Sequence, residues 1–376
     1  MTVKKVAGVP ALGVMKKLLV WSLAIVLLLF VSVFLFVKLS PVFGGKPDDQ
    51  TRTRMLASDN FKDDIFVNRH PVSDDPDSPK PPMGKWLNSV IFPPAGKHPS
   101  GLLPAKLPDF AAQQTPSFTW FGHSTILINT GSMTVLTDPV FYRASPVWLI
   151  GTPYPADKKL TIDGLPYIDA VLISHDHYDH LDAKAIAELD SKTGHFYVPL
   201  AVRAHLLKWG VDDSKITELD WFGDAMLKDT RFIFTPSKHF SGRKPGQRND
   251  TLWGSWVVQA PEVSVYFSGD GGYSPDFAEI GRRFGPFDMA FMEDGAYSPY
   301  WPEIHMLPEE SVQASLDVKA KNVMPIHWGK FDLAFHDWNE PVIRFTRAAE
   351  GKNLNVATPH IGETFTLDSL PQQKWW

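Results

Sequence analysis

The hydrophobic pattern begins with an uninterrupted apolar run near the N-terminus. From Leu18 to Val37 the chain carries 20 residues without a charge. At a rise of about 1.5 Å per residue, a helix of this length spans the roughly 30 Å hydrocarbon core of a bilayer. A cleaved signal peptide is the alternative, but its apolar stretch is shorter, about 7 to 15 residues, and no clean small-x-small site follows Lys38. We therefore predict an uncleaved transmembrane helix within a tail and anchor at residues 1–43.

Lysines flank this apolar run on both sides, so the charge bias that orients membrane helices is small. Lys16 and Lys17 stand directly before the run, whereas Lys38 alone follows it directly. The adjacent pair favours a cytoplasmic N-terminus. This orientation predicts a single-pass membrane protein whose remaining residues lie on the far face of the membrane, which is the periplasm in a Gram-negative source.

The next stretch, residues 44–116, is rich in Pro, Asp, Ser and Lys. This composition favours extended loops over packed elements, so we predict a tether and surface wrap. Within it, Trp86–Pro94 is an apolar island that could cover part of a core or lie on a bilayer surface. Buried aromatic side chains are common, and this favours packing on the core.

From residue 117 onward, short β-rich runs alternate with stretches of helical periodicity. Ser117–Thr130 and Ser132–Val140 are β-rich runs joined at an Asn-Thr-Gly hairpin signal. Ile168–Ser174 is a largely apolar strand, and a helical pattern follows it. The alternation continues to a final helix from about Val342 to Glu350. We predict one α/β domain over residues 117–376, with helices covering a sheet core and ligands bound where strands end.

Composition narrows the chemistry that such a domain can carry. Among 376 residues, 44% are hydrophobic and 12% aromatic, which excludes an intrinsically disordered chain. The net charge of −5 argues against a nucleic-acid partner. The absence of Cys excludes disulfides, thiolate metal sites and a Cys nucleophile. Chemistry built from His, Asp and Glu remains, and the chain has 13 His.

Three of these histidines lie in one short segment, His175–His180, directly after the strand that ends at Ser174. A loop can turn His175 and His177 to one side while Asp179 and His180 reach another point, so one segment can serve two metal ions about 3.5 to 4 Å apart. A purely structural role would leave these polar groups beside a buried strand without partners, which is costly. The segment therefore predicts a metal site.

The segment has the H-x-H-x-D-H pattern of the metallo-β-lactamase fold superfamily, which the chain resembles. The resemblance implies a four-layer αββα sandwich, with further ligands from the later segments TPSKHFSGR, YFSGDGGYS and MPIHWGKF. The implied ligands are divided between two zinc ions: His175, His177 and His239 for the first, Asp179, His180 and His327 for the second, and Asp270 as the bridge between them. Nitrogen and oxygen ligands suit zinc, and by ligand type alone they also suit Fe or Mn.

Two further residues have both a functional and a plain structural interpretation. Asp138 matches a superfamily position and would orient a ligand His, but it would serve equally as a turn residue before Pro139. His305 corresponds to a family position near the metals, where it would bind phosphate or assist the leaving group, and it could instead be a helix cap. On the resemblance we expect Asp179, Asp270 and His305 to be the catalytic residues.

From roughly Phe118 to His336 the resemblance narrows to the N-acylphosphatidylethanolamine phospholipase D branch, through WFGHSTILI, HDHYDHLD, WGSW, SGDGGYS and DGAYSPYWPEIHMLPEESV. It implies a phosphodiesterase that releases N-acylethanolamine and phosphatidic acid from N-acylphosphatidylethanolamine. A phospholipid substrate fits an enzyme anchored in a membrane. The aromatic segments Trp86–Phe92 and Ala296–Trp301 could line an acyl groove, although packing is the commoner role for such residues.

Two other functions fit the same residues. A lactone or other ester hydrolase of this fold would use the same metals on a carbonyl group. An envelope protein that retains metal, with a binding or resistance role and no turnover, is the alternative from a different class. A nuclease would need a basic groove, and the charge balance and the anchor both oppose it.

Overall fold

The computed structural model describes residues 11–72, 84, 88–89, 91–110, 114–148 and 150–376. The chain divides into two compact units, Met1–Phe43 and Gly44–Trp376. The expected packing of Trp86 and Leu87 lies outside the described residues.

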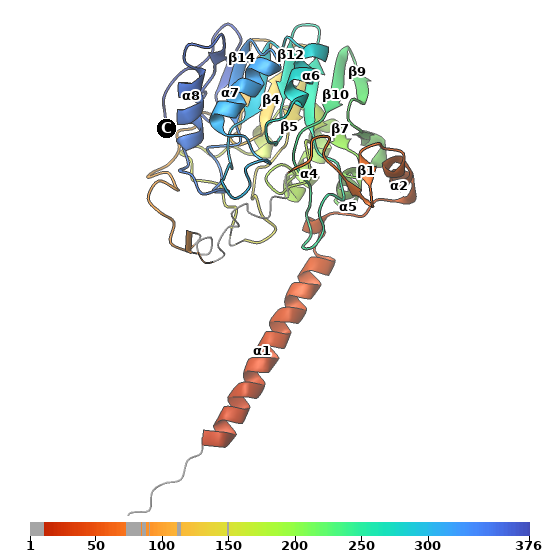
Figure 1. Cartoon of the computed structure of the whole chain (residues 1–376), viewed down its shortest axis with the longest axis vertical. Helices are drawn as coiled ribbons and strands as arrows, with labels where there is room; N and C mark the ends of the chain where they lie inside the picture. The colour runs from red at the N-terminus through yellow and green to blue at the C-terminus, as the bar shows by residue number, and fades with distance from the viewer. Residues whose placement is uncertain (1–10, 73–83, 85–87, 90, 111–113, 149) are drawn as a thin grey trace, which may run out of the picture. The chain divides into compact units, whose positions relative to one another are not determined.

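The first unit is one long helix, α1 (Ala11–Leu39), followed by the short turn η1 (Pro41–Phe43) (Figure 1). Its stretch Gly13–Leu39 is long and apolar enough to cross a membrane. None of the apolar window in this helix is buried inside the described part of the protein. A transmembrane anchor and an N-terminal signal sequence both have these properties, so length and composition leave the two interpretations open.

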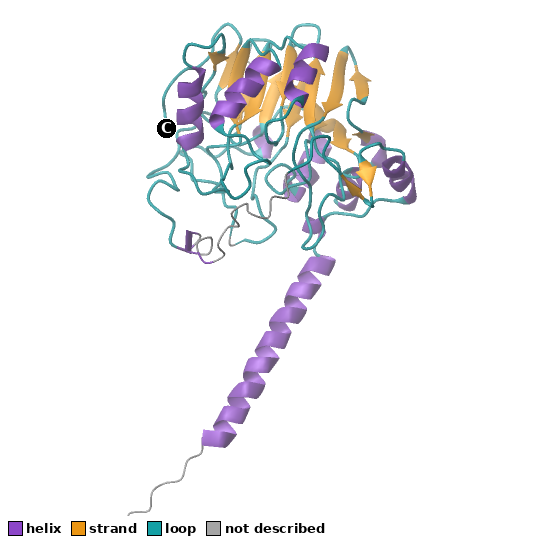
Figure 2. Cartoon of the chain, viewed as in Figure 1, coloured by secondary structure: helices purple, strands orange, loops and turns teal. Residues whose placement is uncertain are grey.

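The second unit contains two seven-stranded sheets, drawn in orange in Figure 2. The first sheet has, in spatial order, β16 (Thr364–Thr366), β3 (Ser117–Trp120), β4 (Ile126–Asn129), β5 (Thr134–Thr137), β6 (Ile168–Leu172), β7 (Thr193–Pro199) and β8 (Ile216–Leu219). The second has β15 (Asn355–Val356), β14 (Asn322–Ile326), β13 (Met289–Glu293), β12 (Ser264–Phe267), β11 (Ser255–Gln259), β10 (Thr230–Thr235) and β9 (Asp224–Leu227).

Each sheet is antiparallel on one side and parallel on the other. Strands β5 to β8 are parallel in the first sheet, and strands β12 to β15 are parallel in the second. Parallel strands end at the same edge of a sheet, so the loops that follow them gather there.

Side chains alternate between the two faces of these strands, which explains the layers. In β10, Phe232 and Phe234 enter the core between the sheets, whereas Ile233 enters the outer core of the second sheet. Helices cover both outer faces. The described helices and 3₁₀ turns of this unit are α2 (Asp49–Leu56), η2 (Ile162–Gly164), α4 (Ala183–Leu189), η3 (Asp190–Lys192), α5 (Arg203–Lys208), η4 (Asp213–Lys215), α6 (Asp276–Arg283), α7 (Pro308–Asp317) and α8 (Glu340–Ala349).

Residues from α4 and α5 pack on the outer face of the first sheet, and residues from α6, α7 and α8 pack on that of the second. The order of layers is therefore helix, sheet, sheet, helix, which confirms the predicted αββα sandwich. The last helix, α8, also lies close to the predicted range.

The stretch at residues 44–116 is more structured at its start than its composition suggested. It forms α2 and the hairpin β1 (Phe61–Lys62) and β2 (Ile65–Phe66). Met55, Phe61 and Phe66 enter the core between the sheets. An average over the whole stretch hides these few apolar positions, because the Pro- and Asp-rich remainder dominates it.

Candidate metal centre

The loop after β6 and the loop after β10 bring three histidines together. His175 Nε2 lies 2.9 Å from His177 Nδ1, and His239 Nε2 lies 3.3 Å from the same nitrogen. The three ligand nitrogens all lie within 4.8 Å of one another. These are the residues that the sequence assigned to the first metal ion.

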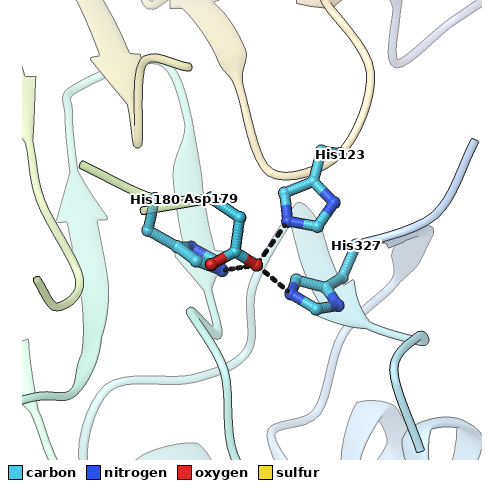
Figure 3. Close-up of side chains that lie close together, drawn as sticks. All are labelled: His123, Asp179, His180 and His327. Atoms are coloured by element: carbon cyan, nitrogen blue, oxygen red, sulfur yellow. Dashed lines mark hydrogen bonds and ion pairs between the residues drawn. The ribbon is translucent and has the colours of Figure 1, made fainter. Parts of the chain in front are cut away.

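A second cluster forms around the carboxylate of Asp179, as Figure 3 shows. Its Oδ2 lies 3.2 Å from His327 Nε2 and 3.4 Å from His180 Nε2. These three residues are the set that the sequence assigned to the second ion. The same oxygen lies 3.1 Å from His123 Nε2, a residue that the sequence analysis did not select.

Asp270 lies between the two clusters. Its Oδ2 is 2.9 Å from His327 Nε2 and 3.1 Å from His180 Nε2, on the second cluster. The same atom is 4.0 Å from His175 Nε2 and 3.9 Å from His239 Nε2, on the first. All seven predicted ligands thus lie close together, with Asp270 between the two clusters.

Asp138 orients two of these histidines. Its Oδ2 lies 2.7 Å from His180 Nδ1 and accepts a hydrogen bond from Ser174 Oγ at 2.5 Å. Ser174 Oγ in turn lies 2.9 Å from His175 Nδ1. Of the two interpretations of Asp138, the structure favours the one in which it fixes the ring of a neighbouring His.

Asp176 explains why His175 and His177 can face one side. It points away from the cluster, where its Oδ1 accepts a hydrogen bond from Gly242 N at 2.7 Å and its Oδ2 lies 3.3 Å from His205 Nε2. The other nitrogen of His205, Nδ1, accepts from Gly45 N at 3.1 Å. The loop that carries His175–His180 is therefore held by residues from three distant segments of the chain.

Asn68 makes a similar connection to His239. Its amide group pairs with both backbone groups of that residue: Nδ2 donates to His239 O at 2.8 Å, and Oδ1 accepts from His239 N at 3.0 Å. The indole of Trp253 also donates to Asn68 Oδ1, at 3.2 Å. Residue 68 belongs to the stretch predicted as tether and wrap, and here it fixes a candidate ligand.

His305 lies at the margin of both clusters. Its ring centroid is 5.1 Å from that of His239 and 5.3 Å from that of His327. Its Nδ1 is 2.9 Å from Glu293 Oε1 and 4.0 Å from Asp270 Oδ2. The structure therefore brings the three predicted catalytic residues, Asp179, Asp270 and His305, close together.

Burial and charge set the protonation of the cluster. Burial lowers the pKa of His175 and His239 well below the usual range, which leaves the neutral imidazole that binds metal ions. Burial acts in the same direction on His327, but the carboxylates of Asp270 and Asp179 raise its pKa to about 9. Despite burial, His180 and His327 hold the pKa of Asp270 well below its usual range.

The donor atoms fit divalent cations. Asp270 Oδ1 and His180 Nε2 are buried and have no hydrogen bond among the described residues, and His180 Nε2 faces the carboxylates of Asp179 and Asp270. Two ionised carboxylates and several imidazoles share a largely buried volume, and cations would satisfy their lone pairs.

Sequence reasoning missed several contributing residues, and three of them contact candidate ligands or His305 directly: His123, Asn68 and Glu293. Each is a single residue without a spacing pattern around it. For His123 there was one usable signal, because it lies in the β-rich run Ser117–Thr130. For the other two no comparable signal exists, since their contacts join segments far apart in the chain.

A cavity of about 310 Å³ has Ser89, Ile150, Trp301 and Phe335 in its described lining. It shares Asp332–Ala334 with the lining of a smaller cavity that His327 also lines. Ser89 and Trp301 belong to the two aromatic segments that the sequence analysis selected as candidates for an acyl groove.

The chain is similar in sequence to known proteins. A family model described as the Beta-lactamase superfamily domain matches residues 133–328. An uncharacterised protein of Mycobacterium tuberculosis is 39% identical over 331 residues, which cover 85% of this chain and 87% of that protein. The N-acyl-phosphatidylethanolamine-hydrolyzing phospholipase D 1 of Caenorhabditis elegans is 32% identical over 238 residues, which cover 60% of this chain and 67% of that protein.

Among solved structures, a possible metal-dependent hydrolase from Veillonella parvula is similar with a TM-score of 0.53 and 19% identity. The similarity covers 67% of this chain and 100% of that one. At this level of identity it shows a common fold.

Proposed function

Because this chain belongs to the metallo-β-lactamase fold superfamily, in its N-acylphosphatidylethanolamine phospholipase D-like branch, we propose that it is a membrane-anchored dinuclear zinc phosphodiesterase. Its proposed substrate is N-acylphosphatidylethanolamine, and its products are N-acylethanolamine and phosphatidic acid. The observation that carries the proposal is the place of Asp270 between two clusters of His and Asp side chains. The fold itself implies a hydrolase that binds divalent metal.

The distances between the side chains divide the proposed ligands into two sets. His175, His177 and His239 would hold one ion, and Asp179, His180 and His327 the other, with Asp270 touching both sets. Imidazole and carboxylate donors suit zinc, and Fe or Mn would meet the same donors. When bound, two such ions acidify a shared water and neutralise charge that develops on a phosphoryl group.

The residues of the chain would perform the remaining tasks. Asp138 and Ser174 fix the rings of His180 and His175, so the donors do not need to reorganise on binding. Asp270 can accept a proton from the attacking water. His305, at the open margin of the centre, can meet the oxygen that leaves phosphorus.

A lipid substrate is supported by two features. The 310 Å³ cavity, which shares lining residues with a smaller cavity that His327 lines, has aromatic and aliphatic residues in its lining, among them Trp301, Leu333 and Phe335. The apolar helix α1, if retained, keeps the enzyme at a bilayer. The similarity to the Caenorhabditis elegans protein supports the same class of substrate.

Purified full-length protein in detergent, supplied with zinc, tests the proposal when it is offered three substrates separately: N-acylphosphatidylethanolamine, a bis-aryl phosphodiester and a lactone. We expect turnover of both phosphodiesters. Turnover of the lactone alone would favour an ester hydrolase of the same fold. Bound metal without any turnover would favour a metal-retaining envelope protein.

Two site variants and one control complete this test. Asp179→Asn and His239→Ala should each lower zinc content and abolish turnover. His195→Ala is the matched control, because His195 lies on β7 and pairs with Thr217 away from the centre. If both site variants keep full metal content and full activity, the assignment of the centre is wrong.

A further inference from the structure

Glu293 is a buried carboxylate at the centre that the predicted set of ligands does not include. It ends β13 and is fully buried. Its Oε1 lies 2.9 Å from His305 Nδ1, and its Oε2 accepts a hydrogen bond from Met306 N at 3.1 Å. The carboxylate therefore contacts the His305 ring and the backbone immediately after it.

The backbone of Glu293 is fixed as firmly as its side chain. Its N–H donates to Ser268 Oγ at 2.9 Å, and its carbonyl oxygen accepts from Ser311 Oγ at 2.6 Å. These contacts come from the end of β12 and from α7, on either side of β13. A carboxylate held in this way has little freedom, so it can define the orientation of a ring that bonds to it.

His305 is the more accessible partner. Its side chain is 11% exposed, whereas those of His239 and His327 are 1% exposed. Because Glu293 occupies Nδ1, the nitrogen left to meet a substrate is Nε2. Within the described residues, no hydrogen bond engages that second nitrogen.

We propose that Glu293 is a positioning residue that directs His305 to deliver a proton from Nε2 to the leaving oxygen of an alkyl phosphodiester. This inference rests on the proposed phosphodiesterase function. Water oxygen forms a bond to phosphorus while the bond between phosphorus and the alcohol oxygen breaks. The proton of His305 Nε2 goes to the departing oxygen, and the proton that the attacking water gives to Asp270 later returns to the ring. The Glu293 carboxylate bonds to Nδ1–H throughout, so the ring stays oriented.

This role identifies the chemical class of substrate. An unactivated alkyl alcohol is a poor leaving group, because its alkoxide is strongly basic, and a positioned acid accelerates its departure about 10²- to 10⁴-fold. A nitrophenolate leaves without a proton. The pair formed by Glu293 and His305 is therefore useful only for a phosphodiester of an alkyl alcohol.

The test compares leaving groups in the full-length, zinc-loaded protein. Glu293→Gln preserves side-chain size and the acceptor for Met306 N, but it removes the charge. We expect kcat on N-acylphosphatidylethanolamine to fall about 10²-fold or more, with KM unchanged, and kcat on bis(4-nitrophenyl) phosphate to fall no more than about threefold. Zinc content should stay equal to that of the wild type. Glu309→Gln, on the exposed side of α7 where Glu309 pairs with Arg344, is the matched control and should change neither rate.

His305→Ala should reproduce the same difference between leaving groups, and the double variant should lose little more than either single variant. A fall in zinc content in Glu293→Gln would make Glu293 a metal ligand and overturn the proposal. Equal losses on both substrates, or no loss on either, would overturn it too while leaving the phosphodiesterase function intact. Failure of the wild type to hydrolyse the lipid would overturn the function and this inference together.

Discussion

All of these histidines are buried, so the carboxylates beside them decide which of them carry protons before any metal binds. His175 and His239 have few carboxylate neighbours, and burial keeps them neutral. His327 lies against Asp179 and Asp270, and it holds a proton despite burial. A cation that binds at the second cluster therefore has to displace protons, whereas the first cluster already presents free lone pairs.

His123 gives the first prediction at this scale. Its ring lies 4.0 Å from that of His327, centroid to centroid, and its Nε2 touches Asp179. We expect His123→Ala to lower the affinity for zinc at the second cluster about 10- to 100-fold. The affinity at the first cluster should not change, because that cluster does not contact His123. Titration with a competing chelator measures both affinities. Two unchanged affinities would show that His123 takes no part in binding.

Lys330 gives a second prediction. Burial lowers the pKa of its amino group to about 7, and the amine donates to Phe121 O at 3.0 Å and Val140 O at 2.7 Å. Between about pH 7 and 10 the unfolded chain binds a proton at this residue that the folded chain does not. The free energy of unfolding of the wild type should therefore rise with pH, by up to about 1.4 kcal/mol per pH unit.

Lys330→Met removes this dependence. Guanidinium unfolding followed by Trp fluorescence at several pH values gives the difference between wild type and variant, which should grow as pH rises above 7. Lys321→Met, at an exposed lysine paired with Asp288, is the control and should give a difference that does not change with pH. A constant difference for Lys330→Met would contradict the lowered pKa.

The residues that sequence could predict at the centre are those that share a short segment or follow a recognisable pattern. His175, His177, Asp179 and His180 lie within six positions, and the resemblance then supplied His239, Asp270 and His327. Glu293 could not be found in this way. It touches His305 only because β13 and the loop before α7 meet in three dimensions.

At the scale of elements, the hairpin β1–β2 and the residues after it form part of the centre. Phe61 and Phe66 anchor the hairpin in the core, and Asn68 follows directly and pairs with the backbone of His239. Arg69 bonds to Asp276 at 2.5 Å, which ties the same segment to α6. A truncation that removes this stretch would therefore disturb the loop after β10.

Asn68→Ala tests this connection. The change removes three hydrogen bonds, so we expect weaker zinc binding at the first cluster, by about 10- to 100-fold, and faster cleavage of residues 44–72 in limited proteolysis. Asn68→Asp keeps the acceptor for His239 N and should have a smaller effect. Asn60→Ala, which loses one bond to Asp220 away from the centre, is the control. Equal effects of Asn60→Ala and Asn68→Ala would contradict a specific role for residue 68.

Elements of the fold could be predicted from the sequence where the spacing of apolar residues was regular over a short segment. The hairpin between β4 and β5 and the helix α8 follow from turn chemistry and apolar spacing. The helix α2 did not, because Thr51 and Met55 are its buried positions and five of the other six residues are polar or charged. Its stability comes from packing and from an N-cap, in which Thr51 N donates to Asp48 Oδ1 at 2.8 Å.

At the scale of the whole molecule, the apolar helix should decide where the enzyme works. Because the second unit has its own cores, removal of residues 1–40 should release a protein that keeps its zinc and hydrolyses dissolved bis(4-nitrophenyl) phosphate within about twofold of the full chain. On lipid vesicles, activity should fall tenfold or more as the local concentration at the bilayer is lost. Unchanged vesicle activity would show that the helix is dispensable for access to lipid.

The membrane topology can be tested separately. With the N-terminus in the cytoplasm, alkaline phosphatase fused after residue 376 should be active, because that enzyme matures only outside the cytoplasm. An inactive fusion would reverse the proposed orientation. The mass of the mature protein decides between an anchor and a cleaved signal, since cleavage would remove the lysines at positions 4, 5, 16 and 17.

The spread of the proposed ligands from the loop after β6 to the loop after β14 bears on how the protein is made. The first cluster is complete only once His239 has been synthesised, and the second only once His327 has been synthesised. Long-range contacts form late in folding, since the loops that they close are long. A chain that crosses a membrane unfolded therefore acquires its ions only after transport. The metal ions available in the compartment that receives the protein, rather than those where the chain is synthesised, then determine which metal fills the site.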